Sequence, residues 1–187
     1  MTPTENTARR TISSLRPILT YLLFVFVISI IIYYVPDFSI LEAWIAQHSS
    51  FILNSIGVST KANLVGDSVF IGTIQVIRDC TGIQVIAVFA GLLLPVPKTS
   101  WRKKVTVVAA IAIFVYSTNL LRVVVQYWLM AEGVLPWSFA HYPVSLILGA
   151  ICVAIIIVLT DRILPEFANF VSRQINEVEF RFRVARR

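Results

Sequence analysis

The chain has 187 residues, of which 57% are hydrophobic and 14% are charged, and its mean hydropathy is +0.80. Soluble domains carry about 45–50% apolar and about 25% charged residues, so this composition excludes a wholly water-soluble globule and predicts a membrane protein. The length suffices for one helical bundle and leaves no room for a separate soluble domain. The net charge of +6 comes mainly from basic residues beside apolar segments, which favours membrane orientation over nucleic-acid binding.

Four segments with at most one charge are candidates for crossing about 30 Å of hydrocarbon, which takes about 20 helical residues. They cover residues 17–35, 80–96, 105–128 and 142–160. The first is longer than the roughly 7–15 apolar residues of a signal-peptide core, and no A-x-A cleavage site follows it, so we expect a retained anchor. The third contains the one charged residue within these spans, Arg122.

Two shorter elements are expected between the first and second spans. Residues 40–57 carry apolar side chains at helical spacing with polar residues between them, namely Leu41, Trp44, Ile45, Phe51, Ile52 and Ile56. This pattern predicts an amphipathic helix that lies on the membrane interface or on the bundle. Residues 62–78 are rich in β-branched side chains and are interrupted at Gly66-Asp67 and Gly72, which predicts a short outer β-hairpin or an extended flap.

Lysine and arginine are distributed unequally about the predicted spans. With both termini in the cytoplasm, 13 of the 16 basic residues lie on the cytoplasmic side, including those of a basic tail over residues 161–187, and the outer side holds Lys61 and Arg78. The positive-inside rule describes this distribution. We therefore predict an all-α polytopic protein of the plasma membrane, a single domain over residues 1–187, with about four transmembrane helices and both termini cytoplasmic.

In this topology three chemically capable residues reach the outer leaflet: Cys80 begins the second span, Arg122 lies near the outer end of the third, and His141 precedes the fourth. A helix start stabilises a thiolate at Cys80, as does a neighbouring arginine. His141 is suited to carry protons to a leaving amine and from an acceptor. Arg122 keeps its charge and is suited to hold a thiolate, an oxyanion or a carboxylate.

Four further residues are expected to support this site. The backbone N–H groups of Thr81 and Gly82 are candidate oxyanion donors, because they follow Cys80 at a helix start. Asn119 and Gln126 lie three residues before and four after Arg122, on the same helix face, where they are placed to orient its guanidinium. We expect no metal and no cofactor.

Structural interpretations remain open for each of these residues. Cys80 is also explained as a small apolar residue at a helix end, and Arg122 as a side chain that snorkels to the interface, although charges inside spans usually mark function. His141 and His48 both fit an aromatic belt at the interface. Cys152, within the fourth span, is expected to pack, and Asp79 to cap a helix N-terminus.

The ordered set of C-T-G-I at residues 80–83, N-L-L-R at 119–122 and a histidine at 141 resembles the exosortase/archaeosortase family. The resemblance covers roughly residues 62–160. It implies a membrane cysteine transpeptidase that recognises exported proteins by a C-terminal motif, hydrophobic helix and basic tail. It also implies that Cys80 is the nucleophile, Arg122 the family's arginine and His141 the acid/base, with a lipid amine or water as acceptor.

Two other functions compete with this hypothesis. The first is a non-enzymatic membrane protein, such as an assembly factor or a small transporter subunit, in which Arg122 binds a lipid phosphate; transporters tend to show paired repeats, which this sequence lacks. The second is a membrane redox protein that uses Cys80. It requires a second thiol nearby, and Cys152 is expected in the middle of a span.

Overall fold

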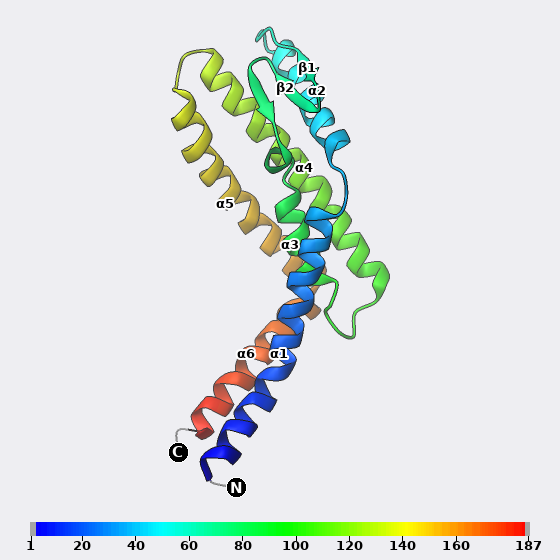
Figure 1. Cartoon of the computed structure of the whole chain (residues 1–187), viewed down its shortest axis with the longest axis vertical. Coiled ribbons are helices and arrows are strands. Elements are labelled where there is room, and N and C mark those ends of the chain that lie inside the picture. Colours follow the sequence, from blue (N-terminus) through cyan, green and yellow to red (C-terminus); the bar gives the residue numbers. More distant parts are fainter. Residues whose placement is uncertain (1–2, 186–187) are drawn as a thin grey trace.

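The computed structural model describes the backbone of residues 3–185 and the side chains of residues 16–136, 139, 142–176 and 179. The elements follow one another as α1 Pro3–Tyr34, α2 Ser39–Ser55, β1 Ala62–Val65, β2 Ser68–Ile71, β3 Ile74–Val76, a 3-10 turn Arg78–Thr81, α3 Ile83–Leu93, α4 Trp101–Ala131, α5 Trp137–Ile163 and α6 Pro165–Ala185. One end of the molecule, here called the terminal end, carries the start of α1 and the end of α6 (Figure 1). The opposite end, here called the sheet end, carries α2, the strands and the α4–α5 connection (Figure 1).

Among the residues that the structure describes, three helical segments are long and apolar enough to cross a membrane: Arg16–Tyr34, Trp101–Ala131 and Tyr142–Ile163. They cover three of the four predicted spans. Within the other, residues 80–96, only Ile83–Leu93 forms an α-helix, because Gly82 adopts a left-handed conformation before it and Pro95 and Pro97 follow it. Eleven residues extend about 16 Å, roughly half of the hydrocarbon thickness. The prediction of one helix over the whole of 80–96 is therefore wrong.

Helix α3 packs lengthwise against α1. The hydroxyl of Tyr21 donates to the carbonyl of Leu92 at 2.6 Å, and that of Ser29 donates to the carbonyl of Ala87 at 3.1 Å. Residue numbers rise along α1 while they fall along α3, so the two helices are antiparallel. The segment between the strands and α4 thus runs from the sheet end toward the terminal end, beside α1.

The predicted helix over 40–57 is present as α2, and it lies on the bundle rather than apart from it. Ile45, Ala46 and Leu53 are fully buried against the sheet and α4. Trp44 and Phe51, which the apolar pattern assigned to the same face, are instead 53% and 75% exposed. Apolar residues occur all around this helix, so periodicity alone did not identify the face that packs.

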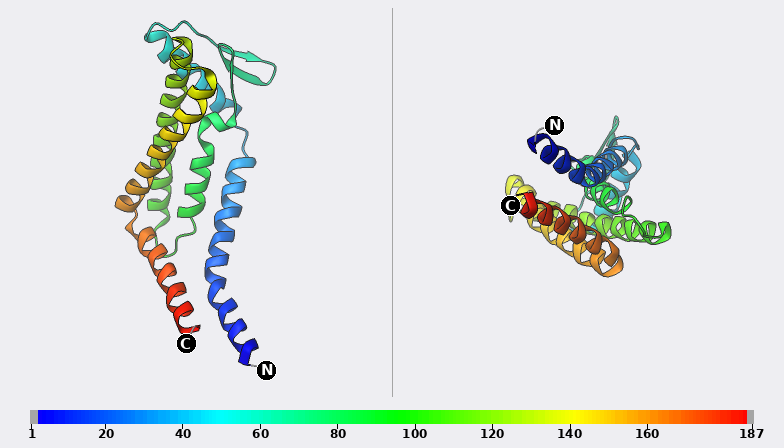
Figure 2. Two further views of the ribbon diagram at one scale, coloured as in Figure 1. Left: turned by 90° about the vertical axis from the view of Figure 1, so that its left-hand side faces the viewer. Right: turned by 90° about the horizontal axis from the view of Figure 1, so that it is seen from below.

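The segment predicted as a hairpin forms a three-stranded antiparallel sheet in the order β1-β2-β3. Both turns are two residues long: Gly66-Asp67 joins β1 to β2, and Gly72-Thr73 joins β2 to β3. One face of the sheet packs on α2 through Val69, Ile71 and Val76, which are all buried. The β1–β2 hairpin projects sideways from the helices (Figure 2). The predicted hairpin was therefore one strand short.

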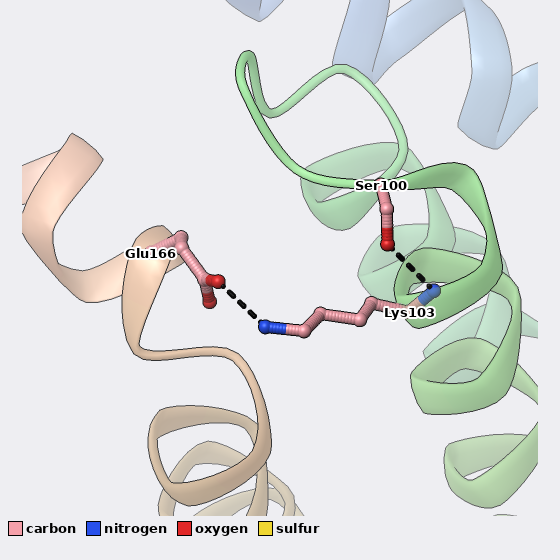
Figure 3. A network of polar contacts seen from close by, with 3 residues as sticks. All are labelled: Ser100, Lys103 and Glu166. Carbon is pink, nitrogen blue, oxygen red and sulfur yellow. Dashed lines mark hydrogen bonds and ion pairs between the residues drawn. The ribbon is translucent and has the colours of Figure 1, made fainter.

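The basic tail is largely helical, as α6, and returns beside α1. The rings of Phe170 and Tyr21 meet edge to face with 5.0 Å between their centroids. Lys103, in the first turn of α4, donates to Glu166 Oε1 in the first turn of α6 at 2.9 Å, and the Lys103 backbone N–H donates to Ser100 Oγ at 3.4 Å (Figure 3). The start of α4 therefore lies beside the α5–α6 junction.

Candidate active site

Cys80 lies in the 3-10 turn Arg78–Thr81, here called the Cys80 turn, which joins β3 to α3. Its backbone N–H donates to the carbonyl of Ile77 at 2.7 Å. The buried hydroxyl of Thr81 donates to the carbonyl of Arg78 at 2.6 Å and accepts from the N–H of Ile83 at 3.3 Å. Thr81 therefore holds the turn to the start of α3 through its side chain, and the nucleophile candidate stands just before the α-helix begins.

Helix α4 binds the backbone of the Cys80 turn at two consecutive carbonyls. The side-chain amide of Asn119 donates to the carbonyl of Cys80, and Nη2 of Arg122 donates to the carbonyl of Asp79 at 3.4 Å. The two donors lie three residues apart and so share one helix face. The C-T-G-I and N-L-L-R segments therefore meet, as the sequence predicted, although Asn119 contacts the turn and not the guanidinium.

Gly82 allows this close approach. Its φ of +74° is in the left-handed region, and a Cβ built there would lie 2.7 Å from Cγ1 of Val115 on α4. Only glycine adopts such a conformation without strain and leaves space for the neighbouring helix. The glycine of the C-T-G-I segment therefore has a packing role that sequence reasoning, which considered its N–H group, did not foresee.

A pocket of about 80 Å³ opens between the Cys80 turn, α4 and α5. The side chains of Asp79, Asn119 and Arg122 line it together with Gly149 and Cys152 on α5. Nε of Arg122 is buried and has no hydrogen-bond partner among the described residues. Asp79 and Cys80 are the acidic residues nearest to act on its guanidinium. An arginine with an unused donor thus borders the candidate nucleophile.

The two cysteines are both free and have different surroundings. Cys80 is half-buried and packs against the core that α2, the sheet and Val124 form. Cys152 is buried among the apolar residues of α4 and α5, and its Sγ lies 3.3 Å from the hydroxyl of Thr118. Cys152 packs as predicted, yet it also borders the Arg122 pocket, which its position in the sequence did not indicate.

The end of α1 holds the Cys80 turn from the opposite side to α4. The Tyr33 hydroxyl donates to Oδ1 of Asp79 at 2.9 Å, and Gln84 Nε2 donates to the same oxygen. Arg78 donates to the carbonyl of Tyr33 at 3.2 Å and lies over the rings of Tyr33 and Phe38. The prediction that Asp79 is a helix N-cap is wrong, because its carboxylate bonds to side chains of α1 and α3.

The contacts of Gln126 concern α5. Its Nε2 donates to the hydroxyl of Ser145 at 2.5 Å. The backbone of His141 is at the fifth residue of α5, one helical turn before Ser145, while the His141 side chain lies outside the described residues. Gln126 therefore fixes the start of α5 against α4 on the sheet side of Arg122.

The other histidine, which the sequence assigned to an aromatic belt, contacts α4. Nδ1 of His48 on α2 lies 2.6 Å from the hydroxyl of Tyr116. Tyr116 comes three residues before Asn119, so this pair ties α2 to the helix that binds the Cys80 turn. The sequence carried no signal for it, because the partners are 68 residues apart.

A family model described as transmembrane exosortase matches residues 6–161 of the chain. The chain belongs to the transmembrane exosortase family. No curated protein and no solved structure was found to match the chain. Exosortase membership confirms the resemblance carried by residues 80–83, 119–122 and 141, which all fall inside the matched region. It indicates a membrane protein of a protein-sorting transpeptidase family.

The exosortase match ends before α6 begins at Pro165. It includes the sheet, the Cys80 turn and the parts of α4 and α5 that border the Arg122 pocket. The elements that meet around Cys80 are therefore those that the family model describes.

Proposed function

We propose that the chain is a membrane cysteine peptidase or transpeptidase that cleaves C-terminal sorting signals from exported proteins. The observation that supports this most strongly is that Arg122 and Asn119 bind the consecutive carbonyls of Asp79 and Cys80. This pairing brings the backbone of the turn that carries Cys80 beside the guanidinium of Arg122. An arginine that only snorkels to the membrane interface does not need to bind the backbone of the Cys80 turn.

In the proposed reaction the Cys80 thiolate attacks the carbonyl carbon of the scissile peptide bond and forms a tetrahedral oxyanion. Arg122 stabilises the negative charge, and its Nε, which has no hydrogen-bond partner among the described residues, is a donor suited to this. Collapse of the oxyanion breaks the C–N bond, and the leaving amine takes a proton from His141. The exported protein remains as a thioester on Cys80. An acceptor amine, for example on a lipid, or water then attacks the thioester, gives its proton to His141 and releases the thiolate.

The proposed site lies on the outer face of the plasma membrane. The start of α1 and the end of α6 lie at the terminal end of the molecule (Figure 1), and the predicted topology puts 13 of the 16 basic residues on that side of the spans, so the positive-inside rule puts that side in the cytoplasm. The second crossing is then made by α3 together with the Cys80 turn and the proline-containing segment after Leu93. A substrate's hydrophobic helix lies within the membrane, with its cleavage site outside.

Thiol labelling tests the nucleophile directly. A water-soluble maleimide should modify Cys80 near neutral pH and leave the buried Cys152 unmodified, because a thiolate beside an arginine reacts faster than a thiol of pKa about 8.5. In cells that co-express an exported protein with a C-terminal hydrophobic helix and basic tail, mass spectrometry should find its end removed. Cys80→Ala should abolish this removal, and Cys152→Ala should leave it at the parent rate. Processing by Cys80→Ala at matched expression would refute the proposed function.

A further inference from the structure

Strand β3 is an edge of the sheet, and it leads directly into the Cys80 turn. The sheet order β1-β2-β3 leaves one side of β3 without a neighbouring strand. Ile77 continues the extended backbone beyond β3, with φ −109° and ψ 170°, and the Cys80 turn begins at the next residue. An edge strand presents unpaired N–H and C=O groups that serve as a template for another extended chain.

The register shows which backbone groups face that free edge. Hydrogen-bonded and non-hydrogen-bonded pairs alternate along an antiparallel ladder. The N–H of Gly72 donates to the carbonyl of Lys61 at 3.1 Å, so Gly72 points its backbone groups away from β3. Because the direction alternates along the strand, the N–H and C=O of Ile71 point toward β3. Ile71 pairs with Ile74, and Val69 with Val76. Between them, Gln75 directs its own N–H and C=O away from β2.

Two residues along this edge are exposed to solvent. Gln75 is exposed and Ile77 is 46% exposed, whereas Val76, on the other face, is 2% exposed. Among the described residues, no hydrogen bond from another element reaches the backbone of Gln75. The side chain of Gln75 donates to Ser68 on its own sheet, and so it does not cover the edge.

We propose that the segment of the substrate just before its cleavage site binds as an additional strand on the free edge of β3. This inference rests on the proposed function, in which the substrate is a polypeptide that Cys80 attacks. Backbone hydrogen bonds to the N–H and C=O of Gln75 and to the N–H of Ile77 hold the substrate extended, as in other cases of strand addition to a sheet edge. The edge then delivers the scissile carbonyl to the thiol, because the same backbone continues into the Cys80 turn.

The direction and the length of the added strand follow from the geometry. β3 runs toward the Cys80 turn, and the proposed substrate descends toward its membrane helix in the same direction, so the two strands are parallel. Gln75 and Cys80 are separated by at most about 13 Å, from two extended steps of about 3.3 Å and three 3-10 steps of about 2.0 Å. About four extended substrate residues cover this distance. The paired residues therefore lie about four positions before the cleaved bond.

The opposite edge of the sheet provides a matched control. Leu64 on β1 pairs with Val69 in a non-hydrogen-bonded position, so its N–H also points away from β2. Leu64 is 72% exposed, and β1 does not lead to the Cys80 turn. Proline is tolerated on an edge strand where the missing N–H faces solvent. Gln75→Pro and Leu64→Pro therefore disturb their two edges equally.

The experiment measures how fast each variant processes a co-expressed reporter that carries the C-terminal end of an exported protein with a hydrophobic helix and basic tail. Gln75→Pro should process the reporter about tenfold more slowly or worse, because it loses a backbone bond and places ring carbons where the substrate strand lies. Leu64→Pro should process it at the parent rate. Maleimide should label Cys80 equally fast in both variants, which shows an intact turn.

The outcomes separate this inference from the proposed function. Parent-rate processing by Gln75→Pro, with Cys80→Ala inactive, overturns the edge inference and leaves the proposed function in place. An equal loss in Leu64→Pro also overturns it. Processing by Cys80→Ala removes the proposed function and the inference together. If labelling of Cys80 changes in Gln75→Pro, a proline scan of the reporter before its cleavage site decides instead: sensitivity at alternate residues supports strand addition, and uniform sensitivity contradicts it.

Discussion

Substitution of Gly82 by alanine should separate the Cys80 turn from α4. Two costs add at this position. The left-handed backbone conformation costs an L-residue about 1–2 kcal/mol. The new Cβ would also lie 2.7 Å from Cγ1 of Val115, well inside the normal carbon–carbon separation of about 3.5–4.0 Å, and overpacking of this kind costs about 1–3 kcal/mol. We expect Gly82→Ala to lower the free energy of unfolding by about 2–5 kcal/mol.

Gly66→Ala is the matched control for the conformational cost. Gly66 also has a left-handed backbone, with φ +59°, but a Cβ there meets nothing within 4 Å. Gly66→Ala should therefore lower the free energy of unfolding by only about 1–2 kcal/mol. Adding Val115→Ala to Gly82→Ala should remove the steric part of the loss. Unfolding of the purified protein in detergent, followed by circular dichroism, measures these differences.

The same variants report on the site. When the turn moves away from α4, the bond from Asn119 to the carbonyl of Cys80 weakens, so the rate of maleimide labelling at Cys80 should change in Gly82→Ala and stay constant in Gly66→Ala. If Gly82→Ala is no more destabilising than Gly66→Ala, the close packing of the turn against α4 is not what requires glycine, and the reasoning fails.

Three other predictions concern orientation, the arginine and a pH-dependent contact. In a chain without its natural cysteines, Ser59→Cys should react with an impermeant maleimide from outside the cell and Ser172→Cys only after lysis; the reverse pattern would contradict the proposed orientation. Arg122→Lys should keep the membrane insertion but lose most processing, because an ammonium lacks the planar fork of donors, and full activity in Arg122→Gln would refute a catalytic role. The hydrogen bond from Lys103 lowers the pKa of Glu166 below its ordinary value of 4.5, so this contact stabilises the fold above that pH and its contribution disappears as the pH falls below it. The difference in melting temperature between the parent and Glu166→Gln should accordingly be small at pH 7 and vanish in acid, and a difference that grows in acid would contradict the assignment.

The features that the sequence predicted well are those that long apolar runs or local turn chemistry specify. The three spans around residues 17–35, 105–128 and 142–160 contain enough consecutive apolar residues to exclude most alternatives. The breaks at Gly66-Asp67 and Gly72 became the two tight turns of the sheet. The contact between the Cys80 turn and α4 was predictable because topology put residues 80–83 and 119–122 at the same end of the bundle, so their separation along the chain did not matter.

The features that the sequence did not predict depend on contacts between distant residues. Nothing local indicates that Asp79 bonds to Tyr33 on α1, or that His48 meets Tyr116. In α2, Ile45 and Phe51 are similarly apolar, and only the position of the sheet and α4 decides that the first is buried and the second exposed. The length of α3 was overestimated for a related reason, since hydropathy records that a segment is apolar but not where its helix begins.

The way in which α4 holds the Cys80 turn has a consequence for how the turn can vary in evolution. Asn119 and Arg122 bond to main-chain carbonyl oxygens of the turn, and every amino acid supplies such an oxygen. Relatives can therefore exchange the residue at position 79, or alter the charge beside the thiol, while the same two donors keep the turn in place. Position 82 has no such freedom, because the path of the main chain there depends on the absence of a side chain. The candidate nucleophile of the proposed site is thus carried on a segment whose shape depends on main-chain contacts more than on its side chains.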